Sequence, residues 1–131
     1  MELVCTTCSK RKRRAPGLLP ARHRYLSKRI RYVLSLAEHG SRLAAILSGR
    51  YGLLAPDDRI PWYDQVLAPD GVEVLLPRLI EQLRSLGATS AVFYAQPPST
   101  AGWEPYHEAL EQACRRLGIR LEVRLLNASL P

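Results

Sequence analysis

The sequence predicts a single α/β domain over residues 1–131, doubly wound and Rossmann-like, with about four parallel strands in the order 2-1-3-4 and three main helices. Two observations support this prediction. Short apolar runs alternate with longer segments whose apolar residues recur at helical spacing, and strands that alternate with helices form parallel sheets covered on both faces. A chain of 131 residues is also long enough to bury one core without disulfides.

Four short apolar runs predict the strands, at residues 3–7, 43–48, 91–96 and 121–126. Three apolar stripes of helical period predict the helices, from Leu26 to Ala37, Val72 to Leu86 and Trp103 to Leu117. Gly40, Gly87 and Gly118 follow them in C-cap positions. Pro77 either kinks the second helix or marks its first turn. The connection over residues 50–71 carries its own apolar side chains, so we expect an ordered loop.

Ligands of such sheets bind beyond the carboxyl ends of the parallel strands. The segments that begin at Cys8, Ser48 and Gln96 follow the first three predicted strands, so we expect them to converge on one site. Gln96 could offer its amide to the edge of a base. This topology places a candidate site before any motif is considered.

The positive charge is concentrated near the N-terminus. The chain has a formal net charge of +7, and 10 of its 19 Lys and Arg residues lie between Lys10 and Arg31. Such a segment attracts phosphates, and we expect Ser9 and Lys10 to contribute to an anion site. The alternative is a solvated basic surface that serves only solubility.

The segment Ser48-Gly49-Arg50-Tyr51-Gly52 begins where the second strand ends. The glycines allow close approach of the backbone to a ligand, Arg50 offers a charged fork for phosphate, and Tyr51 offers a stacking face. The alternative is a tight turn that only seats the following loop.

Three side chains are candidates for catalysis. Lys12 lies among other cations, which disfavours its charged form and suits an amine nucleophile or base. Ser48 could act as a nucleophile, and Asp64, which follows Tyr63, as an acid-base partner. The alternatives are an exposed basic patch for Lys12 and an anchor between the loop and the basic segment for Asp64.

Cys5 and Cys8 have the Cys-x-x-Cys spacing of zinc and redox sites. No second ligand pair of recognisable spacing accompanies them, so we predict that Cys5 and Cys114 are core residues and expect neither a metal nor a cofactor. The N-terminus lacks the pattern of a signal peptide and no apolar run is long enough to span a membrane. We therefore expect a cytoplasmic protein without a membrane partner.

Residues 47–56, Leu-Ser-Gly-Arg-Tyr-Gly-Leu-Leu-Ala-Pro, with Ile60 and Tyr63 further on, resemble the signature segment of the bacterial peroxide-stress YaaA-like proteins. They also resemble a group of short bacterial proteins of unassigned function with the same loop and a Tyr-Asp pair at Tyr63-Asp64. The YaaA resemblance implies an α/β fold, DNA binding and a role in limiting oxidative stress.

Cys8 and Lys12, with Tyr25 and Ser27 downstream, resemble the lysine-bearing domain of archaeosine synthase. In that family the lysine attacks a deazaguanine nitrile in tRNA. The resemblance implies that Lys12 is a candidate nucleophile and that Cys8 and Ser27 contribute to ligand binding.

The sequence thus predicts a nucleotide or nucleic-acid binding domain of YaaA-like type, linked to stress or to nucleic-acid modification. Its partner would be an anionic, nucleotide-like ligand or nucleic acid. The alternatives are an enzyme that acts on a modified nucleobase or nucleoside through Lys12 or Ser48, and a protein-interaction domain with a basic face. The sequence leaves the oligomeric state open.

Overall fold

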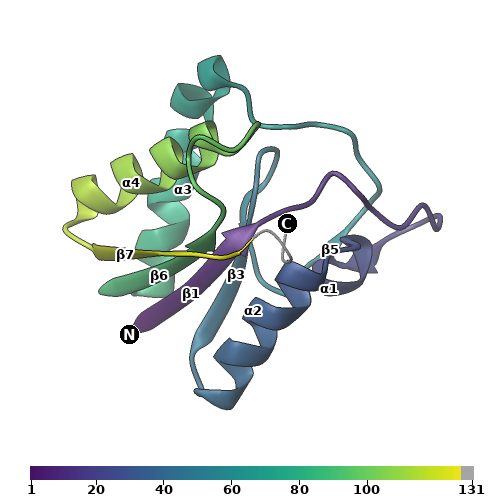
Figure 1. The fold of residues 1–131 in the computed structure, drawn as a ribbon, viewed down its shortest axis with the longest axis horizontal. Coiled ribbons are helices and arrows are strands. Elements are labelled where there is room, and N and C mark those ends of the chain that lie inside the picture. Colours follow the sequence, from purple (N-terminus) through teal and green to yellow (C-terminus); the bar gives the residue numbers. More distant parts are fainter. Residues whose placement is uncertain (128–131) are drawn as a thin grey trace.

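The structure is a computed structural model that describes residues 1–127 of the chain (Figure 1). Its elements follow in the order β1 (Glu2–Thr7), β2 (Leu19–Pro20), α1 (Ala21–Arg24), α2 (Lys28–His39), β3 (Leu43–Ser48), β4 (Gly52–Leu54), β5 (Arg59–Ile60), the 3₁₀ turn η1 (Pro69–Gly71), α3 (Val72–Leu86), β6 (Ser90–Ala95), α4 (Glu104–Leu117) and β7 (Arg120–Leu125).

A five-stranded sheet in the order β4-β3-β1-β6-β7 forms the centre of the molecule. β1 pairs in parallel with β3 and β6, and β6 pairs in parallel with β7. The predicted α/β class is therefore confirmed, as are strands at the four predicted places. The fifth strand, β4, was not predicted. It runs antiparallel to β3 because the chain reverses in the turn over residues 49–51, after which Gly52 begins β4 with a φ of 74° in the left-handed region.

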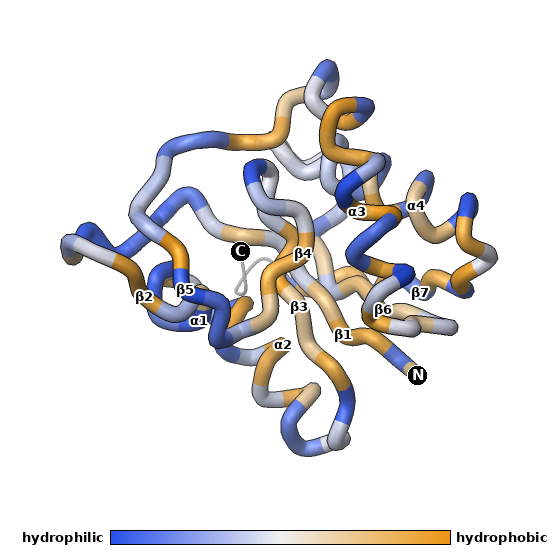
Figure 2. Tube along the Cα trace, turned by 180° about the vertical axis from the view of Figure 1, so that it is seen from behind, coloured by the Kyte–Doolittle hydropathy of each residue, from blue (hydrophilic) through white to orange (hydrophobic). Residues whose placement is uncertain are grey.

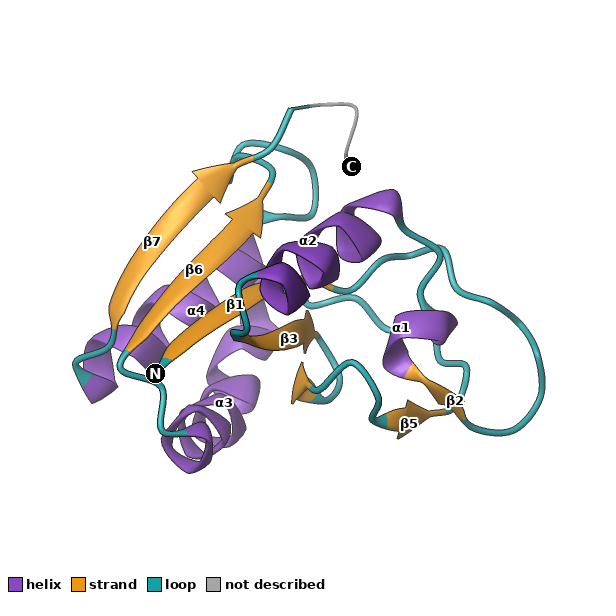
Figure 3. Cartoon of the chain, turned by 90° about the horizontal axis from the view of Figure 1, so that it is seen from below, coloured by secondary structure: helices purple, strands orange, loops and turns teal. Residues whose placement is uncertain are grey.

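Helices cover both faces of the sheet (Figure 3). α2 packs on β1 and β3 from one side, and α3 and α4 pack against each other on the opposite side. Alternate residues of β1 therefore enter different clusters: Leu3 and Cys5 contact the α3 and α4 side chains, whereas Val4 packs with Val33 of α2. Cys5 and Cys114 are both buried in the α3 and α4 core, as predicted.

The three predicted helices correspond to α2, α3 and α4. Gly87 and Gly118 cap α3 and α4 with φ of 69° and 68°, in the left-handed conformation that a glycine C-cap favours. Pro77 lies inside α3 rather than at its start. Among residues 1–127, no helix has both the length and the apolar character that crossing a bilayer demands.

A small ribbon of β2 and β5, together with α1, lies beside the sheet (Figures 1 and 3). It is built from the basic N-terminal segment and from the connection after β3, which is ordered as predicted but contains β4, β5 and η1 rather than loop alone. Figure 2 shows hydrophobic residues gathered in the central strands and hydrophilic ones around α1. The cationic segment is thus held against the body of the domain.

Candidate functional site

A cleft of about 710 Å³, here called the main cleft, opens beyond the carboxyl end of β1. Four segments line it: the residues after β1, the start of α2, the end of the long connection and the start of α4. The lining residues are Thr7, Cys8, Ser9, Lys10, Arg11, Lys12, Leu26, Ser27, Lys28, Arg29, Gln65, Val66, Leu67, Ala101, Gly102, Trp103 and Tyr106. The cleft therefore lies at the edge of the sheet where the sequence predicts a site.

The main cleft is strongly cationic. Five of its lining residues are Lys or Arg, and none of these seventeen described residues is Asp or Glu. The N-termini of α2 and α4 both border it, and each N-terminus adds the partial positive charge of its helix dipole. The lining thus suits an anion.

Arg29 is the most unusual of these cations because its side chain is only 3% exposed. Its Nη1 donates to Thr6 Oγ1 and to the carbonyl oxygen of Thr7 at 2.8 and 2.7 Å, and its Nη2 donates to the carbonyl oxygen of Cys8 at 3.3 Å. The guanidinium carbon also lies 4.8 Å from the centre of the Trp103 ring.

No carboxylate of residues 1–127 forms an ion pair with Arg29, and its Nε has no hydrogen-bond partner within that range. Burial lowers the pKa of Arg29 to about 10, although Cys8 and Tyr106 act in the opposite direction. A buried cation without a counter-ion is costly, and an anion in the cleft would compensate it. Arg29 was not among the predicted site residues. It lies four residues before Val33, so both residues are on the same face of the helix, and this spacing could have indicated that Arg29 is buried.

Lys12 connects the main cleft to a buried polar cluster. Its Nζ lies 4.6 Å from the centre of the Tyr63 ring and 5.9 Å from that of Tyr25. Burial lowers the pKa of Lys12, while Cys8 and Asp64 act in the opposite direction. The pKa of Lys12 is thus lowered as the sequence suggested, but by burial rather than by neighbouring cations, and Lys12 lies in the cleft lining.

The polar cluster consists of Ser48, Tyr25 and Tyr63. Ser48 Oγ is 2.9 Å from Tyr63 Oη, which is hydrogen-bonded in turn to Tyr25 Oη. Ser48 Oγ also accepts from the backbone N–H groups of Arg50 and Tyr51 at 3.1 Å each. Burial raises the pKa of Tyr25 and Tyr63 far above the ordinary tyrosine value, so both hydroxyls stay protonated at neutral pH.

Replacing Tyr63 by phenylalanine is expected to lower the free energy of unfolding by about 1–3 kcal/mol, because it leaves two buried hydroxyls without their shared partner. Urea unfolding measures the change. Tyr32→Phe is the matched control, since Tyr32 on α2 is 44% exposed and its variant should stay within about 0.5 kcal/mol of the parent. Equal stability of Tyr63→Phe and the parent would contradict a structural role for the cluster.

Five of the predicted site residues meet in the main cleft: Cys8, Ser9, Lys10, Lys12 and Ser27. Ser9 Oγ donates to the carbonyl oxygen of Arg11 at 2.7 Å. Ser27 caps α2 by accepting from the backbone N–H of Ile30 at 3.3 Å. Their hydroxyls therefore shape the backbone that borders the cleft.

The segment Ser48–Gly52, here called the glycine corner, does not line the main cleft. A Cβ on Gly49 would lie 2.8 Å from the backbone nitrogen of Leu67, and one on Gly52 would collide with Gln82 Oε1. Gln82 Oε1 accepts from the backbone N–H of Leu53 at 2.7 Å. These contacts explain why a residue with a Cβ does not fit at either position.

Six further predicted site residues lie outside the lining of the main cleft: Ser48, Arg50, Tyr51, Tyr63, Asp64 and Gln96. Arg50 is exposed, with its guanidinium carbon 5.5 Å from the centre of the Tyr51 ring. The centres of the Tyr51 and Tyr63 rings are 5.3 Å apart, with the rings edge to face. Tyr63 also contacts Lys12, so it lies between the glycine corner and the lysine. Asp64 is exposed, and Gln96 Nε2 donates to the carbonyl oxygen of Asn127 at 2.9 Å.

Arg24 organises the basic segment that borders the cleft. It is fully buried, and its Nη groups donate to the carbonyl oxygens of Arg13, Ala15 and Gly17 at 2.7–2.9 Å. Its Nε and Nη2 also donate to the carbonyl oxygen of Ile60. One side chain thus links three backbone carbonyl groups of the loop to β5.

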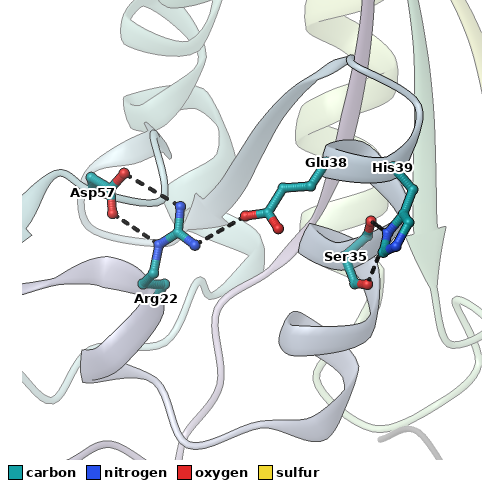
Figure 4. Close-up of polar contacts among 5 residues, drawn as sticks. All are labelled: Arg22, Ser35, Glu38, His39 and Asp57. Carbon is teal, nitrogen blue, oxygen red and sulfur yellow. Dashed lines mark hydrogen bonds and ion pairs between the residues drawn. The ribbon is translucent and has the colours of Figure 1, made fainter.

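Arg22, on the same short helix, makes ion pairs at the surface. Figure 4 shows it between Asp57, at 2.8 Å, and Glu38, at 3.2 Å. These contacts join α1 to the long connection and to α2.

Compared with family models, curated proteins and solved structures, the chain shows no match. The resemblances described above therefore remain predictions.

A second hollow, here called the basic groove, adjoins the main cleft. It measures about 310 Å³ and is lined by Arg11, Arg13, Arg22, His23, Tyr25, Leu26, Ser27, Lys28 and Arg31. Arg11, Leu26, Ser27 and Lys28 belong to both linings. Positive charge therefore continues from one hollow into the other.

Proposed function

We propose that the main cleft binds the phosphate of a nucleotide or of a nucleic-acid strand. The observation that supports this most strongly is Arg29, a buried guanidinium without a carboxylate partner among residues 1–127, in a lining that holds five cations. A phosphate would supply the missing counter-charge, and Arg binds phosphate through paired hydrogen bonds.

Apolar side chains at the cleft provide a place for a base. Leu26 and Val66 are 37% and 54% exposed, and both line the main cleft. A base packed on them would place its phosphate toward the cations of α2 and the basic segment. For a strand, the basic groove offers Arg11, Arg13 and Arg31 to further phosphates.

In this proposal the protein is a cytoplasmic binding domain of the YaaA-like type, with a role in stress or nucleic-acid modification. That role follows from the resemblance of residues 47–56, whereas the binding of an anion follows from the cleft.

Salt dependence tests the proposal. Fluorescence polarisation with a labelled 12-nucleotide DNA or RNA strand should show Kd rising roughly 100-fold between 50 and 200 mM NaCl, as expected for about five neutralised phosphates. ATP should compete for the main cleft. Failure to bind single strands, duplex and ATP at 50 mM NaCl would refute the proposal.

A second candidate function is catalysis on a modified nucleobase or nucleoside through Lys12. The lowered pKa of this lysine and its place in the cleft lining favour it over Ser48, which is fully buried. An amine that is neutral at lower pH than usual can attack an electrophilic carbon.

Pyridoxal 5′-phosphate is a suitable probe because it joins a phosphate to an aldehyde. The Lys12 amine should attack the aldehyde carbon, form a C=N bond and release water; borohydride then fixes the product. We expect peptide mapping to find Lys12 labelled several-fold faster than Lys10 and Lys28, since its amine is more often neutral. Equal labelling rates of the three lysines would refute the proposal that the Lys12 amine is unusually reactive.

A further inference from the structure

The three cysteines occupy different environments. Cys5 is 0% exposed and Cys114 is 1% exposed, and burial raises the pKa of both thiols, that of Cys114 to about 11. Cys8 is half-buried and lines the main cleft. Because the thiolate is the reactive form of cysteine, and because it must be accessible, Cys8 alone of these three combines access with a polar environment.

Cys8 has polar and cationic neighbours. Its Sγ is 3.5 Å from Tyr106 Oη, a hydroxyl kept protonated by burial, which raises its pKa. Its carbonyl oxygen accepts from Nη2 of Arg29. Lys12 and Arg29 line the same cleft as Cys8, so two cations border the space into which the sulfur opens.

The same cations select what can reach the sulfur. The lining around Cys8 holds Lys10, Arg11, Lys12 and Lys28 in addition to Arg29, whose Nε has no partner within residues 1–127. A small reagent that carries carboxylates would be concentrated in this cleft, and a cationic one would be repelled. A cleft of about 710 Å³ is large enough for a molecule of several hundred daltons.

We propose that Cys8 is a thiolation site that reacts with anionic, low-molecular-weight disulfides. The Cys8 thiolate attacks one sulfur of the disulfide, a new S–S bond forms to Sγ, and the original S–S bond breaks. The other half leaves as a thiolate and takes up a proton. Cys8 is thereby oxidised to a mixed disulfide, and the leaving half of the reagent is reduced to a thiol.

Thiolation would also control the cleft. The attached group places its own carboxylates beside Arg29 and Lys12, where they occupy the space and the charge that a phosphate would use. This consequence rests on the proposed function, but the reaction at Cys8 does not.

Three disulfides of different charge test the proposal on the intact protein: dianionic 5,5′-dithiobis(2-nitrobenzoate), neutral bis(2-hydroxyethyl) disulfide and dicationic cystamine. Each rate is divided by the rate of the same reagent with N-acetylcysteine amide, which removes differences in intrinsic reactivity. We expect the normalised rate to fall from the anion to the neutral reagent to the cation, by about tenfold or more in total. Peptide mapping should place the adduct on Cys8, with Cys5 and Cys114 unmodified.

Two charge variants provide the matched comparison. Lys12→Met should reduce the anion-to-cation ratio several-fold, whereas Arg116→Met should leave it unchanged. Arg116 is exposed in the last turn of α4, about 15 Å along the helix from Tyr106. The proposal is overturned if Cys8 stays unmodified in the folded protein, if Cys114 reacts as fast, or if Lys12→Met keeps the full charge preference.

A final measurement separates the two proposals. If Cys8 reacts as described and the parent binds ATP, the thiolated protein should lose ATP binding, and dithiothreitol should restore it. If Cys8 reacts and the unmodified protein binds no nucleotide, thiolation stands and the nucleotide proposal fails. If ATP binds and Cys8 does not react, the reverse conclusion holds.

Discussion

Replacing Arg24 by alanine is expected to lower the free energy of unfolding by about 3 kcal/mol or more. The fully buried guanidinium donates to four carbonyl oxygens, at Arg13, Ala15, Gly17 and Ile60. Alanine supplies no donor, and hydrogen bonds from a charged group are about twice as strong as neutral ones. Ordering of the basic segment should therefore be lost together with much of the global stability.

Urea unfolding gives the change in stability, and limited proteolysis between Arg13 and Leu18 reports on the loop. Arg22→Ala is the matched control from the same short helix. Its ion pairs involve partners whose side chains are 66% and 77% exposed, so we expect a loss of about 1 kcal/mol or less. Similar losses for the two variants would contradict the organising role of Arg24.

Replacing Arg29 by methionine is expected to weaken binding of the 12-nucleotide strand about 100-fold, which corresponds to about 2.7 kcal/mol. The charge lies in a buried position where water screens it little, so its contact with phosphate is strong. Arg29→Lys keeps the charge and loses the planar fork, so an intermediate loss of about tenfold is expected.

Lys28→Met is the control, because Lys28 precedes Arg29 on α2, lines the same cleft and is exposed. Solvent screening should limit its loss to about threefold. Circular dichroism and urea midpoints establish that each variant is folded before polarisation is measured. Folded Arg29→Met and Arg29→Lys proteins that both bind like the parent would refute an anion site at Arg29.

Much of the fold is predictable because its main elements are defined by local patterns. The strands β1, β3 and β6 are mostly apolar runs, β7 alternates charged and apolar residues, and α2, α3 and α4 carry continuous apolar stripes. The strands β2, β4 and β5 have only two or three residues each. Their pairing depends on neighbours distant in sequence, which local patterns do not reveal.

The candidate site is only partly predictable. Three segments that follow strands, beginning at Cys8, Ser48 and Gln96, were expected to converge on one site. Only the segment that begins at Cys8 lines the main cleft, whereas Ser48 and Gln96 lie outside its lining. Arg29 escaped prediction because an arginine is normally exposed, and its burial depends on the carbonyls of Thr7 and Cys8. Gly49 and Gly52 were interpreted as ligand contacts, but their close neighbours are Leu67 and Gln82. Such packing cannot be distinguished from ligand approach by glycine spacing alone.

The internal anchoring of the basic segment by Arg24 has a consequence for how fast and how favourably an anion associates. Neighbouring cations repel each other. A flexible loop rich in Lys and Arg would therefore have to become ordered when it binds its ligand, at an entropic cost. Here the hydrogen bonds of Arg24 hold the backbone of the basic segment, so the cleft is preorganised. Association should accordingly be governed by diffusion and electrostatic steering rather than by loop closure.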